Sequence, residues 1–161
     1  MTAPTSFIVS ALPIERFEHL FGLSDEALAA HGATRVVAGD DGHYPCRVTL
    51  EDAAPGQSLL LVNYEHQPTP TPYRSNYAIF VSEAARETRR MAPDALPAVL
   101  RGRSIALRAY DAGGMLLNAE LVLADDDVAE KARARLDDPA VAYLHAHNAA
   151  PGCYAARIDR P

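Results

Sequence analysis

Residues 141–158 read VAYLHAHNAAPGCYAARI, and this stretch carries the densest group of reactive side chains in the protein. Two β-prone runs flank a Pro151-Gly152 turn, a pattern that predicts a hairpin of antiparallel strands. His145 and His147 are two residues apart within an apolar run. Because side chains alternate along a strand, both imidazoles leave the same face. We expect the rest of the chain to form the scaffold, or one wall, of a site at this hairpin.

The register of the hairpin decides where Cys153 points. With a loop over residues 148–152, Cys153 pairs with His147 and lies on the same face. With a loop one residue shorter, Tyr154 takes that position and Cys153 turns to the opposite face. In the first register the Cys153 thiolate and the His147 imidazole could meet, and Asn148 could orient the imidazole. Cysteine nucleophiles use such an arrangement. The alternative is a thiol that only packs, because cysteine is among the most buried residue types. The catalytic candidates are His145, His147, Asn148 and Cys153.

The upstream chain contains short runs of strand character and a few short helical patterns. Strands are predicted at residues 6–12, 35–38, 46–50, 58–65, 77–81, 103–110 and 115–123. Helices are predicted at residues 13–21, 24–32, 84–91 and 127–137. Consecutive hairpins outnumber strand–helix–strand units, which favours an α+β fold with a mainly antiparallel sheet of short strands and three or four short helices. No repeat or boundary divides residues 1–161, so a single domain is expected.

Two of these runs bear on the site. Residues 46–50 alternate, so that Cys46 and its apolar partners share one face while Arg47 lies on the other. Cys46 is therefore expected to pack in the core. Residues 58–65 are apolar on both faces, which is typical of a covered central strand. That strand ends at His66, before a loop over residues 67–72 that holds three prolines.

Composition excludes several classes of function. The chain has 161 residues and a net charge of −6, which disfavours nucleic-acid binding because phosphate contacts need clustered lysine and arginine. No apolar stretch is long enough to span a membrane, and no signal peptide is recognised. Two cysteines do not make a disulfide framework, so a cytoplasmic location with reduced thiols is expected.

Arginine supplies nearly all the positive charge, and the only lysine is Lys131. A partly buried guanidinium requires an anionic partner, either an acidic side chain or a bound carboxylate or phosphate. Internal partners are available at Glu51, Glu65, Asp111 and Glu120. The candidate ligand-binding residues are Arg47, Arg74, Arg108 and Arg157, together with His66 and Tyr73 near the proline loop.

The sequence favours a protein that binds or acts on a small anionic metabolite through a histidine, arginine and cysteine pocket. One alternative is a non-catalytic interaction or structural module in which these side chains close polar networks. A second alternative is a protein that binds metal through histidine and cysteine, because paired histidines are half of a metal site and Cys153 is the one sulfur nearby in sequence. That count falls short of the three or four ligands of a typical zinc site. Since no P-loop, GxGxxG or HExxH motif occurs, no cofactor and no metal site are assigned.

Seven short segments resemble blocks of one family: PCRVTL at 45–50, YEH at 64–66, PYR at 72–74, IFV at 79–81, RAYD at 108–111, HAHNA at 145–149 and GCYAAR at 152–157. The family is a bacterial domain of unknown function, numbered 1203, and the resemblance extends over nearly the whole chain. The segment at 145–149 with the one at 152–157 is its most specific part. The resemblance implies a small standalone bacterial protein and implies no activity.

Overall fold

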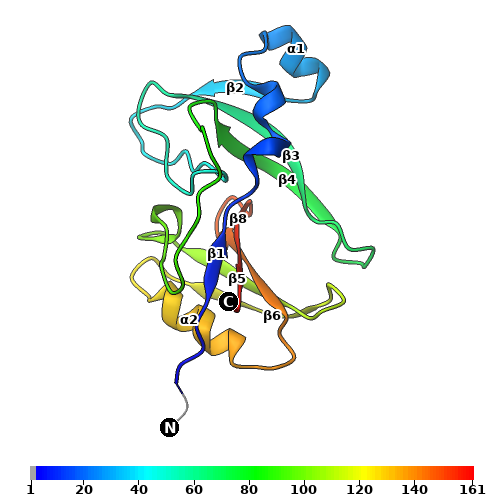
Figure 1. Cartoon of the computed structure of the whole chain (residues 1–161), viewed down its shortest axis with the longest axis vertical. Helices are drawn as coiled ribbons and strands as arrows, with labels where there is room; N and C mark the ends of the chain where they lie inside the picture. Colours follow the sequence, from blue (N-terminus) through cyan, green and yellow to red (C-terminus); the bar gives the residue numbers. More distant parts are fainter. Residues whose placement is uncertain (1–2) are drawn as a thin grey trace.

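The computed structural model describes residues 3–161 and contains two antiparallel sheets (Figure 1). The larger has five strands in the order β1 (Ile8–Ser10), β8 (Tyr154–Asp159), β7 (Tyr143–Asn148), β5 (Ile105–Tyr110) and β6 (Leu116–Val122). The smaller has three, β2 (Thr34–Val37), β3 (Ser58–Gln67) and β4 (Ser75–Ser82). The helices are α1 (Asp25–Ala30), α2 (Val128–Leu136) and three single 3-10 turns. The α+β prediction with mainly antiparallel strands is confirmed, whereas the number of helices was overestimated.

The five-stranded sheet has two chemically different faces. One face carries small and aliphatic side chains, such as Leu107, Leu144 and Ala146, which pack with Ala132 and Leu136 of α2. The alternate residues of the same strands include Arg108, Tyr110, His145 and His147. Since strand side chains alternate, burying the aliphatic set under α2 turns the polar and aromatic set toward the other sheet.

The three-stranded sheet has its own core. Leu60 and Val62 of β3 pack with Ile79 and Val81 of β4, with α1 and with the 3-10 turns Ile14–Arg16 and Glu18–Leu20. Strand β3 pairs with both neighbours, and its register with β4 shifts between Tyr64 and Gln67. In Figure 1 this sheet lies at one end of the molecule and the five-stranded sheet at the other. The last residues of β3 therefore lie at the junction between the sheets.

Several local signals are confirmed. Ser24 caps α1 by accepting a hydrogen bond from the Ala27 amide at 3.1 Å, and Asp127 caps α2 by accepting from the Glu130 amide at 3.2 Å. Both caps satisfy amides that have no partner inside their own helix. The predicted hairpin over residues 103–123 forms between β5 and β6. The final hairpin forms between β7 and β8.

Three predicted elements are wrong, for one physical reason. Residues 46–50 form turns, with Leu50 at a φ of +57° and its amide bonded to the Cys46 carbonyl at 2.9 Å. Residues 84–91 form no helix, because their backbone bonds to distant partners: the Arg89 amide donates to the Val48 carbonyl at 2.9 Å. Residues 13–21 form two 3-10 turns in place of one helix. Long-range contacts hold the other two segments as well: the Arg47 amide donates to the Phe80 carbonyl at 3.2 Å, and the Ile14 amide donates to Thr88 Oγ1 at 2.9 Å. In each case contacts outside the segment override the local pattern.

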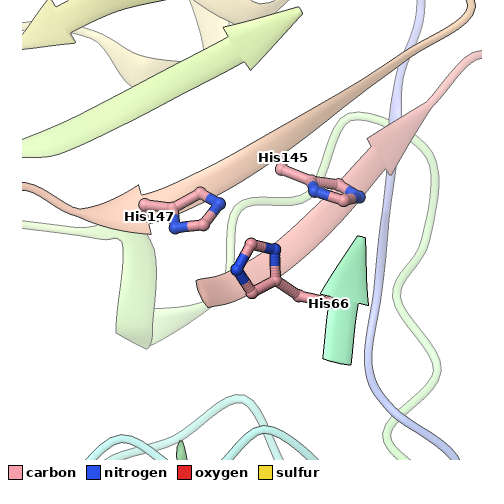
Figure 2. Close-up of side chains that lie close together, drawn as sticks. All are labelled: His66, His145 and His147. Carbon is pink, nitrogen blue, oxygen red and sulfur yellow. The ribbon is translucent and has the colours of Figure 1, made fainter. Parts of the chain in front are cut away.

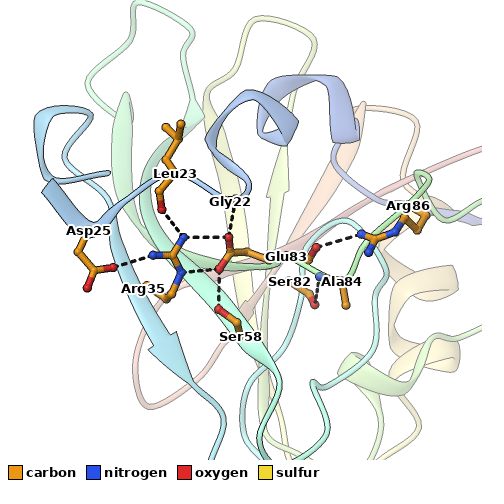
Figure 3. Close-up of polar contacts among 9 residues, drawn as sticks. All are labelled: Gly22, Leu23, Asp25, Arg35, Ser58, Ser82, Glu83, Ala84 and Arg86. Carbon is orange, nitrogen blue, oxygen red and sulfur yellow. Dashed lines mark hydrogen bonds and ion pairs between the residues drawn. The ribbon is translucent and has the colours of Figure 1, made fainter. Parts of the chain in front are cut away.

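A polar network fixes the outer end of the three-stranded sheet (Figure 3). The Glu83 carboxylate accepts from Arg35 Nε at 2.7 Å, from Ser58 Oγ at 2.5 Å and from the Gly22 amide at 2.9 Å. Arg35 also bonds Asp25 at 2.6 Å. One carboxylate thus links β2, β3, the end of β4 and the segment before α1.

Within residues 3–161, no helix has both the length and the apolar character needed to cross a membrane.

Candidate functional site

Three histidines converge at the junction of the two sheets (Figure 2). His145 and His147 leave the same face of β7, as predicted, and His66 comes from the end of β3. The His66 ring centroid lies 4.9 Å from that of His147 and 6.1 Å from that of His145. One nitrogen from each ring lies within 4.8 Å of the other two. We call these three residues the histidine cluster.

The cluster is buried, and its ring nitrogens lack protein partners. His66, His145 and His147 retain 7%, 3% and 0% exposure. The buried atoms His66 Nδ1, His145 Nδ1 and His147 Nε2 have no hydrogen-bond partner within the described chain. Buried polar groups are nearly always paired, so an unpaired nitrogen on each of three neighbouring buried rings is exceptional.

The tautomer of His147 follows from its one hydrogen bond. His147 Nδ1 lies 2.9 Å from the Gly152 carbonyl oxygen, which can only accept. Nδ1 therefore carries the hydrogen, and Nε2 presents a lone pair toward the cluster. A histidine that donates one nitrogen to a backbone carbonyl while offering the other is the usual state of a metal ligand.

Burial keeps the three rings neutral. Desolvation, reinforced by the neighbouring histidines and arginines, lowers the pKa of His145 to about 3. Desolvation outweighs the Gly152 hydrogen bond and lowers the pKa of His147 to about 3. The pKa of His66 is lowered by desolvation and by the charge of Arg108. All three imidazoles are unprotonated at neutral pH, which is the form that binds a metal ion.

Tyrosines form the wall around the cluster. The Tyr154 ring stacks on His66 with centroids 5.9 Å apart, and Tyr110 packs on His145 at 5.0 Å. Tyr143 stacks on Tyr110 at 5.4 Å and accepts a hydrogen bond from Gln67 Nε2 at 2.9 Å. These contacts fix the ring orientations in place of the carboxylates that often do so around a metal site.

Two of the predicted arginines flank the cluster. Arg108 and Arg157 lie opposite His145 on the neighbouring strands β5 and β8. Arg157 binds Asp159 at 2.8 Å and lies over the Tyr143 ring at 4.0 Å. Arg108 forms no ion pair with any residue in the part of the chain that the structure describes.

Arg74 and Tyr73 lie outside the cluster. Arg74 is 61% exposed and forms an ion pair with Glu65, one of the internal partners considered from the sequence. Tyr73 is an exposed residue of the proline loop. The structure therefore does not bring these two candidates to the histidines.

The hairpin adopts the second of the two predicted registers. His147 pairs with Tyr154, and a bulge follows between Ala146 and His147. Tyr154 consequently takes the place beside the histidines, while Cys153 lies on the other side with its Sγ accepting a hydrogen bond from Asn148 Nδ2 at 3.3 Å. Cys153 and Asn148 both line a cavity of about 490 Å³. The histidines and the thiol belong to opposite sides of one turn.

Arg47 is the candidate whose position departs furthest from expectation. It is 2% exposed, although the strand pattern placed it on the face opposite the core residue Cys46. Its Nε donates to the Tyr154 carbonyl at 2.7 Å and its Nη1 to the Pro45 carbonyl at 2.6 Å. Residues 46–50 form a turn in which Thr49 is half-buried and the other four residues are buried, so the two-faced strand pattern does not apply to it.

The sequence analysis does not bring His66 together with His145 and His147. It places His66 in a ligand pocket and treats the two histidines of β7 as half of a metal site. The one sequence feature that points to His66 is that the predicted strand over residues 58–65 ends there. Placing it beside His145 requires knowing how the two sheets meet, which local patterns do not specify.

Comparisons with known proteins complete the description. No curated protein and no solved structure matches the chain. One family model, described as a protein of unknown function (DUF1203), matches residues 43–160, a span that includes the histidine cluster, Arg47, Arg108 and Cys153. Because this match covers most of the 161 residues, the chain belongs to the DUF1203 family.

Proposed function

We propose that this protein binds a divalent transition-metal ion of the zinc class through His66, His145 and His147. The observation that carries the proposal is that three buried imidazoles converge and that each has a ring nitrogen without a partner in the described chain. A shared cation would satisfy all three lone pairs at once. The metal-binding alternative of the sequence analysis thus gains a third ligand, and its sulfur ligand is replaced by His66.

The donor set favours a particular class of ion. Three imidazoles without a carboxylate or thiolate suit zinc and its neighbours, whereas calcium and magnesium prefer oxygen ligands. Zinc–nitrogen bonds of about 2.0–2.1 Å in a tetrahedral site place the nitrogens roughly 3.4 Å apart. The nitrogens here lie within 4.8 Å of one another, so small ring rotations would close the site. Three protein ligands leave the fourth position open, as in catalytic zinc sites.

The charges around the cluster favour an anion at that open position. Arg108 lies beside the cluster without an ion pair, and no carboxylate belongs to the cluster. A bare cation is opposed by this positive surrounding, and a small anion bound to both the metal and Arg108 would balance it. We therefore propose that metal and a small anionic ligand bind together. The free thiols fit a cytoplasmic setting.

Cobalt(II) titration tests the metal site directly. The wild-type protein should bind one equivalent of cobalt and develop the intense visible absorption of a tetrahedral site, and zinc should displace it. His66→Ala, His145→Ala and His147→Ala should each abolish that spectrum, with folding checked by circular dichroism. The control is the double variant His19→Ala/His31→Ala, which removes an exposed histidine pair with ring centroids 5.9 Å apart.

Either of two results would remove the proposal. One is wild-type protein that binds no cobalt or zinc above the level of the His66→Ala variant. The other is metal binding that disappears only in the His19→Ala/His31→Ala control. In either case the histidine cluster would be a buried polar network, as the interaction-module alternative holds.

A further inference from the structure

A second feature lies on the other side of the β7–β8 turn, outside the histidine cluster. A cavity of about 490 Å³ opens between this turn, strand β4 and the buried turn at residues 45–47. Its volume is in the range of small-molecule sites. The apolar part of its lining comes from Pro45, Leu61, Tyr77, Ala78, Phe80 and Pro151.

One charge in the lining lacks a carboxylate counter-ion. Arg47 is 2% exposed and lines the cavity, and it forms no ion pair with a carboxylate of any described residue; the side chain that faces it as a hydrogen-bond partner is the Cys153 thiol. Its Nε and Nη1 donate to backbone carbonyls, which orient the guanidinium without neutralising it. The other arginine in the lining, Arg103, is already paired with Asp52 at 2.5 Å. A buried, oriented and unneutralised guanidinium is costly unless an anion accompanies it.

We propose that this cavity binds a small monocarboxylate with an apolar body, its carboxylate on Arg47 and its body against Leu61, Tyr77 and Phe80. A single unpaired guanidinium matches one negative charge, whereas a doubly charged phosphate would exceed it. Asn148 and Ser104 also line the cavity and bear groups that can hydrogen-bond a carboxylate. The apolar lining excludes ligands that are charged at both ends.

Cys153 provides a reporter inside the cavity. Its thiol lines the cavity and is half-buried, whereas the other cysteine, Cys46, is fully buried. A thiol reagent such as N-ethylmaleimide should therefore modify Cys153 first, and a ligand in the cavity should slow that reaction. The site of modification is read by mass spectrometry, and Cys153→Ser should remove the fast phase.

Three probes separate charge from shape. Phenylacetate should slow modification of Cys153 by about fivefold or more near saturation, with a hyperbolic dependence on concentration. Phenylacetamide has the same body without the charge, and acetate has the charge without the body. Both should protect much less. Equal protection by phenylacetamide, or no protection by phenylacetate at millimolar concentration, would overturn the proposal.

A cavity-filling variant avoids disturbing Arg47, whose removal would leave two buried carbonyls without donors. Ala149 lines the cavity from the turn, so Ala149→Leu should abolish protection by phenylacetate. Ala112→Leu, in the exposed turn between β5 and β6, is the matched control and should leave protection unchanged. The cavity lies outside the histidine cluster, so protection should also persist in His145→Ala. Unchanged protection in Ala149→Leu would show that phenylacetate binds elsewhere and would refute the assignment.

Discussion

His147 Nδ1 donates a hydrogen bond to the carbonyl oxygen of Gly152 at 2.9 Å, so the turn of the final hairpin sets the tautomer of the most buried histidine. The turn also separates the two proposed sites. The imidazoles lie on one side of it, and Cys153 with the Arg47 cavity lies on the other. A change in the conformation of this turn should therefore affect both proposed sites.

Replacing Gly152 should weaken metal binding through His147. Gly152 has a φ of +81°, a conformation that costs an L-residue about 1 kcal/mol. A Cβ there meets no atom within 4 Å, so Gly152→Ala acts through the backbone alone. Displacing the carbonyl that orients His147 should lower cobalt affinity by about tenfold, the scale for loss of an outer partner of a metal ligand.

Gly56→Ala is the matched control, because Gly56 has a φ of +85° and equally open surroundings, but lies in a turn away from the histidines. Both variants should lose similar stability in urea, and only Gly152→Ala should lose cobalt affinity. Equal cobalt affinities in the two variants would show that the Gly152 carbonyl does not position His147.

Arg108 should couple metal binding to anion binding. If an anion bridges the metal and Arg108, adding acetate should tighten cobalt binding by roughly fivefold or more, within the usual range of coupling between sites. Arg108→Met keeps the aliphatic bulk and should lose most of this effect. Arg74→Met removes an exposed arginine that pairs with Glu65 and should keep it. Cobalt titrations at several acetate concentrations measure the coupling. Wild type and Arg74→Met should both show it, and its absence from wild type would contradict the proposal.

The parts of the fold that could be predicted from the sequence are those fixed by local contacts. Ser24 and Asp127 begin their helices because a side-chain oxygen caps an amide three residues ahead, and both elements are encoded within a few residues. The β5–β6 hairpin is likewise set by its turn. By contrast, the pattern of residues 84–91 predicts a helix, whereas the Arg89 amide in this segment donates to the distant Val48 carbonyl.

The candidate site likewise has features that local sequence patterns predict and features that depend on long-range packing. The common face of His145 and His147 follows from alternation along one strand. The hairpin register was left open because one residue in the loop changes it, and the bulge at Ala146 and His147 determines the outcome. The approach of His66 depends on packing between two sheets, which no local pattern encodes.

The two thiols should differ sharply in their contribution to stability. Cys46 is fully buried, and its Sγ accepts hydrogen bonds from the amides of Ser82 at 3.2 Å and Thr49 at 3.4 Å. Cys46→Ala leaves both amides without that acceptor and should lower the free energy of unfolding by about 1–3 kcal/mol. Cys153→Ala, at a half-buried position, should cost less than about 1 kcal/mol. Urea denaturation under reducing conditions compares them, and equal losses would contradict the packing role assigned to Cys46.

Glu83 should make the stability of the three-stranded sheet depend on pH. Its hydrogen bond with Arg35 is the main cause that lowers the pKa of the Glu83 carboxyl from 4.5 to about 2. A carboxyl with a lowered pKa in the folded protein stabilises it above the unfolded value, and that contribution is lost as pH falls from about 4.5 toward 2. Glu83→Gln keeps the shape and removes the charge. At pH 7 it should lower the free energy of unfolding by about 1–3 kcal/mol, the scale of a hydrogen bond to a charged group.

The difference in stability between wild type and Glu83→Gln should therefore shrink as the pH falls from about 4.5 toward 2, because the wild-type carboxylate loses its advantage as the unfolded chain takes up a proton. Glu87→Gln, at an exposed position four residues along the same segment, should track wild type throughout. Urea titrations at several pH values give the three curves. A difference that stays constant with pH would mean that Glu83 acts through its shape and neutral hydrogen bonds, and that the charge of the Arg35 pair contributes nothing to the stability of this end of the sheet.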